Sequence, residues 1–137
     1  MNSIATRFYA TSAIFALAGM TWGIQMSASG DHTLSPAHGH LNLIGFVAMA
    51  VFGTFYALSP RAAASRLANI HYFLTVAAVL VIVPGIAMAI KGNGEALAKT
   101  GSVLTLATMA LFAYVILRNG VASTRSVETP SLNRPAS

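Results

Sequence analysis

Four long stretches of the sequence contain no Asp, Glu, Lys or Arg, and they constrain the fold more than any other feature. They cover residues 8–30, 32–60, 67–90 and 100–117. A helix needs about 20 apolar residues to cross the hydrocarbon core of a bilayer, and each stretch is close to that length or longer. Only 8% of the residues are charged, whereas a soluble domain carries roughly a quarter. We therefore predict an all-α integral membrane protein, a bundle of four transmembrane helices.

Start and stop signals place these helices at about residues 7–26, 36–58, 67–90 and 97–117, in one domain of residues 1–118. The second helix has the clearest start, with Ser35 as the expected N-cap and Pro36 at the first helical position. The first stretch is longer than the apolar core of a secretory signal, so we expect it to be retained as a helix. Residues 119–137 are rich in Ser, Thr, Pro and Asn, which predicts a disordered tail.

The basic residues are distributed unevenly along the chain. Lys91 and Lys99 lie in the third connection, whereas every arginine lies near the N-terminus, in the second connection or near the C-terminus: Arg7, Arg61, Arg66, Arg118, Arg125 and Arg134. The positive-inside rule then predicts that both termini are cytoplasmic, with a bacterial inner membrane as the expected location. The net charge of +5 is accounted for by this topology, and without a basic face interleaved with aromatic residues we expect no nucleic-acid partner.

Three of the four histidines, His32, His38 and His40, fall within nine residues at the start of the second predicted helix. Ionisable groups at membrane depth are costly, and they are functional candidates for that reason. Residues two apart on a helix point about 200° from each other, so His38 and His40 are predicted to face opposite flanks and to serve separate sites. Asn42 follows His38 by four positions, shares its face and is a candidate partner that orients it.

The other ionisable residues near the histidine pair have weaker roles in this interpretation. A bare metal ion would need further ligands beside His38 and His40, and His32 and Asp31 are the nearest candidates. His71 opens the third predicted helix at the opposite membrane surface, roughly 25–30 Å from His40 at about 1.5 Å per residue. We therefore expect His71 to be a structural histidine at the membrane interface. The absence of cysteine excludes thiolate metal sites and iron–sulfur clusters.

Two segments of the sequence resemble part of subunit I of the haem–copper oxidases. Asp-His-Thr at 31–33, Ala-His-Gly-His at 37–40 and the exit Phe-Tyr-Ala-Leu-Ser-Pro at 55–60 are similar to its tenth helix. Ala-Asn-Ile-His-Tyr-Phe at 68–73 and Val-Pro-Gly at 83–85 are similar to its eleventh. Subunit I consists of three four-helix repeats, and this chain resembles the third, helices nine to twelve. The resemblance implies a homotrimer, since three copies would rebuild the ring of the large subunit.

The resemblance also implies a cofactor and a role for the histidine pair. In that family the pair ligates two haems, so His38 and His40 are expected to ligate haem iron, with one bis-histidine haem b at each subunit interface. The family's copper ligands and active-site tyrosine come from the second repeat, which this sequence lacks, and oxygen reduction and proton pumping are not carried over. The expected function is electron transfer, with a redox partner on the outer face.

Two other functions remain open. One is an oxidoreductase or gas-binding site of the haem–copper type, in which a five-coordinate haem, alone or with copper, binds or reduces O2 or NO. The other is an assembly subunit without a cofactor.

Overall fold

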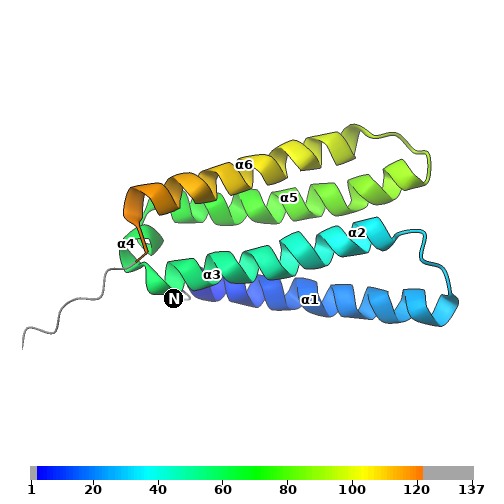
Figure 1. Ribbon diagram of the computed structural model, residues 1–137, viewed down its shortest axis with the longest axis horizontal. Helices are drawn as coiled ribbons and strands as arrows, with labels where there is room; N and C mark the ends of the chain where they lie inside the picture. Colours follow the sequence, from blue (N-terminus) through cyan, green and yellow to red (C-terminus); the bar gives the residue numbers. More distant parts are fainter. Residues whose placement is uncertain (1–2, 122–137) are drawn as a thin grey trace, which may run out of the picture.

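The computed structural model describes residues 3–121, and this part of the chain is helical without a strand. Seven elements follow one another: α1 (Ile4–Ser29), α2 (Ser35–His40), the π-helix η1 (Leu41–Ala48), α3 (Met49–Leu58), α4 (Pro60–Ala63), α5 (Arg66–Ile90) and α6 (Ala96–Asn119). α2, η1 and α3 continue directly into one another and form a single long rod (Figure 1). Each predicted helix therefore corresponds to an observed rod whose ends differ from the prediction by three residues at most.

Three of these rods are long and apolar enough to span a membrane: Ser35–Leu58, Arg66–Ile90 and Ala96–Asn119. The protein is therefore an integral membrane protein by the length and composition of its helices. α1 has 26 residues, but it does not reach the same apolarity. α6 continues two residues beyond its predicted end at 117, to Asn119. Most of the predicted disordered tail, residues 122–137, lies outside the described residues.

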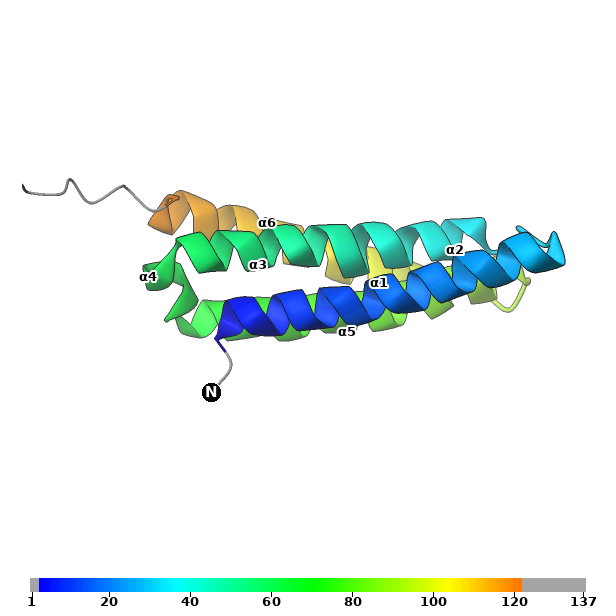
Figure 2. The same ribbon diagram turned by 90° about the horizontal axis from the view of Figure 1, so that it is seen from below.

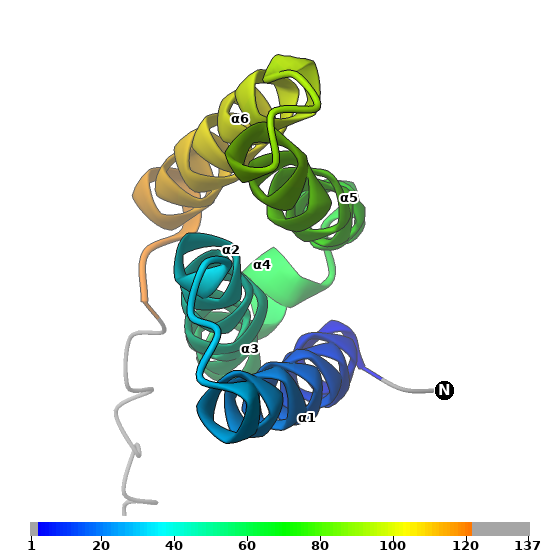
Figure 3. The same cartoon turned by 90° about the vertical axis from the view of Figure 1, so that its right-hand side faces the viewer.

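The rods alternate in direction and form two pairs. α1 runs beside the α2–η1–α3 rod, and α5 runs beside α6 (Figures 1 and 2). The end-on view shows α1 and α6 on the outside, with the other two rods between them (Figure 3). α4 and both ends of the described chain lie at one end of the bundle, and the α1–α2 and α5–α6 loops lie at the other. Residues 3 and 121, the two ends of the described chain, therefore lie on the same side of the bundle.

Small residues let α1 approach the α2–η1–α3 rod closely. A Cβ atom on Gly19 would lie 2.7 Å from the side-chain nitrogen of Asn42, and one on Gly45 would lie 3.1 Å from the Phe15 ring. Ser12, Gly19 and Gly23 form a stripe of small residues on α1, and this stripe faces its own subunit. The surface of this stripe is therefore covered by contacts within the same chain.

The α5–α6 pair packs backbone against backbone. A Cβ atom on Gly85 would lie 2.5 Å from the Ala98 nitrogen, and one on Gly101 would lie 2.5 Å from Ile82 Cα. Carbon atoms in contact normally stand 3.5–4.0 Å apart, so only glycine fits at these two positions. Gly85, which follows Pro84 inside α5, is therefore required for a close helix contact.

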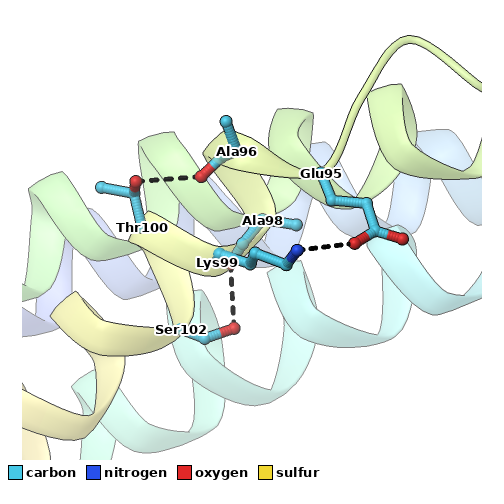
Figure 4. A network of polar contacts seen from close by, with 6 residues as sticks. All are labelled: Glu95, Ala96, Ala98, Lys99, Thr100 and Ser102. Atoms are coloured by element: carbon cyan, nitrogen blue, oxygen red, sulfur yellow. Dashed lines mark hydrogen bonds and ion pairs between the residues drawn. The ribbon is translucent and has the colours of Figure 1, made fainter.

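The start of α6 satisfies its polar groups locally. The Thr100 and Ser102 hydroxyls each donate to the carbonyl four residues earlier, at 2.9 Å, while Lys99 pairs with Glu95 at 2.9 Å (Figure 4). Hydroxyls that bond to their own helix leave no unpaired donor facing lipid. The ion pair is exposed and contributes little to stability.

The first residue of α2 differs from the prediction. Ser35 lies inside the helix, with Leu34 at the cap position, and its hydroxyl donates to the His32 carbonyl at 2.6 Å. Pro36 stands in the first turn as predicted. The serine accordingly closes the turn before the helix and does not cap the helix itself.

Candidate functional site

The imidazole of His38 faces α1. Its Nε2 atom lies 3.0 Å from the Gly19 carbonyl oxygen, and its ring meets the Trp22 ring edge-on with centroids 6.0 Å apart. A carbonyl only accepts hydrogen bonds, so Nε2 must donate. The neutral ring of His38 therefore keeps its lone pair on Nδ1. A Cβ atom on Gly23 would lie 3.2 Å from the same Nε2, so α1 encloses this side of the ring closely.

Asn42 lies with His38 against α1, as its spacing predicted. Its side-chain Nδ2 donates to the His38 backbone carbonyl at 2.9 Å. The amide therefore contacts the backbone of His38 and leaves the ring to Gly19. Since Gly19 has no side chain, both His38 and Asn42 reach the α1 backbone at this point. Asn42 is a support for the position of His38 and is not a direct partner of its imidazole.

His40 lies on another flank of the same rod. Its Nδ1 atom is 2.7 Å from the Pro36 carbonyl oxygen, one turn earlier. By the same reasoning Nδ1 carries the proton, which leaves the Nε2 lone pair of the neutral ring available. A histidine that binds a metal commonly donates its other N–H to a backbone carbonyl in this way, which fixes the tautomer and the ring orientation. The predicted separation of His38 and His40 is thus observed: one faces α1, and the other lines a groove bounded by α6.

The groove beside His40 has a volume of about 380 Å³ and lies between the α2–η1–α3 rod and α6. Small-molecule sites commonly span about 300–1,000 Å³ and are lined mainly by apolar groups with a few polar ones. Thr108 is the notable polar group here, because it is 2% exposed and its Oγ1 has no hydrogen-bond partner. The lining residues are His40, Leu43, Ile44, Val47, Ala48, Phe52, Thr105, Thr108 and Met109.

A π-helix begins directly after His40 and extends over η1, Leu41–Ala48. π-Helical turns are rare, and many of them occur at functional sites. Four groove-lining side chains, Leu43, Ile44, Val47 and Ala48, come from this segment. The apolar pattern predicted a continuous α-helix here and gave no signal for the wider turn. The Asn42 side chain, which bonds a carbonyl four residues back, marks the start of the irregular segment.

The candidates for a bare metal site do not come together. His32 Nδ1 lies 3.2 Å from the Gly30 carbonyl, and the Asp31 carboxylate accepts from the Thr33 backbone N–H at 3.0 Å, so both side chains form hydrogen bonds within their own loop. Hydrogen bonds from Thr33 lower the pKa of the Asp31 carboxyl below its ordinary value. Between residues 3 and 121, no three His, Cys, Asp or Glu side chains are grouped to hold an ion.

His71, the expected structural histidine, occupies the interior of the bundle. It is fully buried, and its Nδ1 lies 3.0 Å from the Tyr56 hydroxyl, while Nε2 has no partner. The rings of Phe52 and Phe112 stand 4.6 and 5.5 Å from it, with Phe8 at 5.4 Å. The spacing of hydrophobic residues did not show which helix faces meet. The aromatic residues near the His71 end of the predicted helices could have indicated that His71 is buried among them. Phe52 also lines the His40 groove, so one ring separates the groove from His71.

Comparison of the chain with known protein families, curated proteins and solved structures gives no match.

Proposed function

We propose that this protein is a haem-binding integral membrane protein with a role in electron transfer. The observation that carries the proposal is His40, whose Nδ1–H is fixed on the Pro36 carbonyl at 2.7 Å beside an apolar groove. This arrangement leaves Nε2 of the neutral ring as a ligand for haem iron. The unpartnered Thr108 hydroxyl in the groove wall also fits a site whose occupant brings a hydrogen-bonding group. Haem, when bound, would supply one-electron redox chemistry.

In this proposal His38, provided by a neighbouring subunit, would be the second histidine that holds the haem. A haem held by two histidines would supply electron transfer. Within one chain His38 has its Nε2 on the Gly19 carbonyl, so ligation through that atom requires this bond to be exchanged. His40 is therefore the first ligand, and His38 completes the site on assembly. A copper ion is not required by this arrangement.

A homotrimer would provide the neighbouring subunit. The resemblance to one repeat of haem–copper oxidase subunit I supports three copies around a ring, with a haem b at each interface. The proposal does not rest on the small-residue stripe of α1, because that stripe packs within the chain. It draws support from exposed apolar side chains on the other face of α1: Ile14, Leu17, Met20 and Ile24 are each 60–72% exposed.

The same exposed face supports α1 as a fourth membrane-spanning helix. We place both termini in the cytoplasm and the histidine pair toward the outer face, where a redox partner would dock. Arg7, Arg61, Arg66 and Arg118 lie in or beside the elements at the end of the bundle that holds the termini. A bacterial inner membrane fits this orientation.

A second candidate is a five-coordinate haem that binds a gas such as NO or O2. The observation that favours it is the bond between His38 and Gly19, which leaves His40 as the one groove-lining imidazole of each chain. A haem held by His40 alone would be able to bind a gas molecule. The protein would then be a gas-binding protein or an oxidoreductase.

The visible absorption spectrum of protein purified in mild detergent from haem-supplied cells tests these functions. The electron-transfer proposal predicts sharp α and β bands on reduction and no change with CO. Replacing His40 by Ala is expected to abolish haem binding, and replacing His38 by Ala to create a CO-sensitive site. His32→Ala is the matched control, because the His32 imidazole forms its hydrogen bond within its own loop, and the spectrum of this variant should equal that of the wild type.

The possible results separate the functions. A CO shift in the wild-type protein would replace the first proposal by the gas-binding one. Protein that stays colourless after haem supplementation would refute both and leave an assembly role.

A further inference from the structure

Three arginines surround one hollow at the end of the bundle that holds the termini. The hollow has a volume of about 470 Å³ and is lined by Arg61, Ser65, Arg66, Leu67, Arg118 and Asn119. Arg61 comes from α4, Arg66 from the first turn of α5 and Arg118 from the last turn of α6. The end of α6 therefore meets α4 and the start of α5, which are close to each other in the sequence, and each contributes one arginine to the lining. The Arg118 guanidinium also donates to the Tyr114 hydroxyl at 3.3 Å.

These charges have no acidic counterpart among the described residues. The two carboxylates in residues 3–121, Asp31 and Glu95, lie beside the loops at the opposite end, and Glu95 pairs with Lys99 there. Arg7 is the remaining arginine of this part of the chain, and it donates to Asn69 at 2.8 Å and lies over the Tyr72 ring. The hollow therefore has a net positive charge that an anion would compensate.

The first turn of α5 borders the same hollow through Arg66 and Leu67. α5 starts at Arg66, and the hydroxyl of the preceding Ser65 donates to the Ala62 carbonyl instead of accepting from the helix. The first N–H groups of this 25-residue helix thus have no side-chain cap. Uncapped N–H groups and the positive end of the helix dipole favour phosphate. Guanidinium groups bind phosphate oxygens through paired N–H donors, so both features select the same ligand class.

The surroundings of the hollow distinguish a lipid from a free anion. It lies beside the last residues of α6 and the first residues of α5, two of the rods that are long and apolar enough to span a membrane. A bilayer crossed by these rods has its headgroups near their ends. Leu117, next to Arg118, is 86% exposed, and Leu58 is 55% exposed three residues before Arg61. A phosphate held by the arginines would extend its acyl chains along these side chains. Basic pockets between transmembrane helices bind anionic headgroups by this combination.

From this geometry we infer that the hollow formed by Arg61, Arg66 and Arg118 binds the phosphate headgroup of an anionic phospholipid. The hollow is separate from the histidine pair. His38 and His40 lie in α2, and the whole of η1 and α3 stands between them and α4, which contributes Arg61 to the hollow. The inference does not depend on haem binding.

Native mass spectrometry of the full chain released from vesicles of phosphatidylcholine and phosphatidylglycerol tests the inference. We expect the wild type to retain phosphatidylglycerol. The double variant Arg66→Gln/Arg118→Gln should retain it about 30-fold more weakly, since each basic residue near the surface contributes about a factor of five. Lys91→Gln/Lys99→Gln removes the same charge from the opposite end and should retain the lipid as the wild type does.

Two further measurements keep the result interpretable. Far-UV circular dichroism checks that the double variant keeps its helices. Arg66→Lys/Arg118→Lys keeps the charge without the paired donors and is expected to bind between the other two proteins. Equal retention by the wild type and the Gln double variant would overturn the inference, and so would displacement of the lipid by millimolar inorganic phosphate, which would show a site for the free anion.

Discussion

The contact between α5 and α6 at Gly101 allows a quantitative test of the fold. Replacing Gly101 by Ala places a Cβ atom 2.5 Å from Ile82 Cα and 2.7 Å from the Ile82 backbone nitrogen. Because normal carbon contacts are 3.5–4.0 Å, the two helices must separate by about 1 Å. The obstacle is backbone, so no side-chain rotation relieves it.

The magnitude follows from two opposing effects. Overpacking of this kind costs about 1–3 kcal/mol, and a backbone obstacle places Gly101→Ala near the upper end of that range. The higher helix propensity of Ala offsets about 1 kcal/mol. We therefore expect a net loss of about 2 kcal/mol in the free energy of unfolding.

Gly39→Ala is the matched control. Gly39 is helical and exposed, and a Cβ atom there would have no neighbour within 4 Å. It should leave stability unchanged or raise it by up to about 1 kcal/mol. Unfolding of both variants by sodium dodecyl sulfate in mixed micelles, followed by far-UV circular dichroism, measures the difference. If Gly101→Ala is as stable as Gly39→Ala, the close approach of α5 and α6 is refuted.

Two further predictions concern polar groups. Tyr56→Phe should lower the free energy of unfolding by about 1–3 kcal/mol, because it leaves His71 Nδ1 unpaired. The double variant Tyr56→Phe/His71→Leu should lose less stability than the sum of the losses of the two single variants. Additive losses in this double-mutant cycle would contradict the buried pair. The bond from the Thr33 N–H to Asp31 should persist above the ordinary carboxyl pKa of 3.8 and be lost as the pH falls through the lower pKa of the folded protein. An NMR titration of the Asp31 carboxyl measures this, and a midpoint at or above 3.8 would refute it.

The helical rods could be predicted from the sequence because charge is excluded from membrane depth. The stretches without charged residues coincide closely with the observed rods, and Pro36 locates the start of the second rod. The opposite directions of His38 and His40 also followed, since they depend only on helix geometry over three residues. Local rules suffice for such features.

Features set by packing between rods could not be predicted in this way. An apolar helix surface carries little information about which side meets which neighbour, so the burial of His71 beside Tyr56 and Phe52 was missed. The bond between His38 and Gly19 depends on the approach of two rods. The same holds for the arginine hollow, whose members lie in three segments.

The π-helix η1 has a consequence for the register of the rod that contains it. Bonding from each residue to the fifth one along places more residues in a turn than an α-helix has. Side chains after Ala48 are therefore rotated relative to those before Leu41, compared with a regular helix of the same length. A regular spanning helix can be superimposed on one half of this rod or on the other, and matching both halves requires a gap within residues 41–48. The position of His40 relative to Phe52 is thus fixed by the length of this segment as much as by the residues in it.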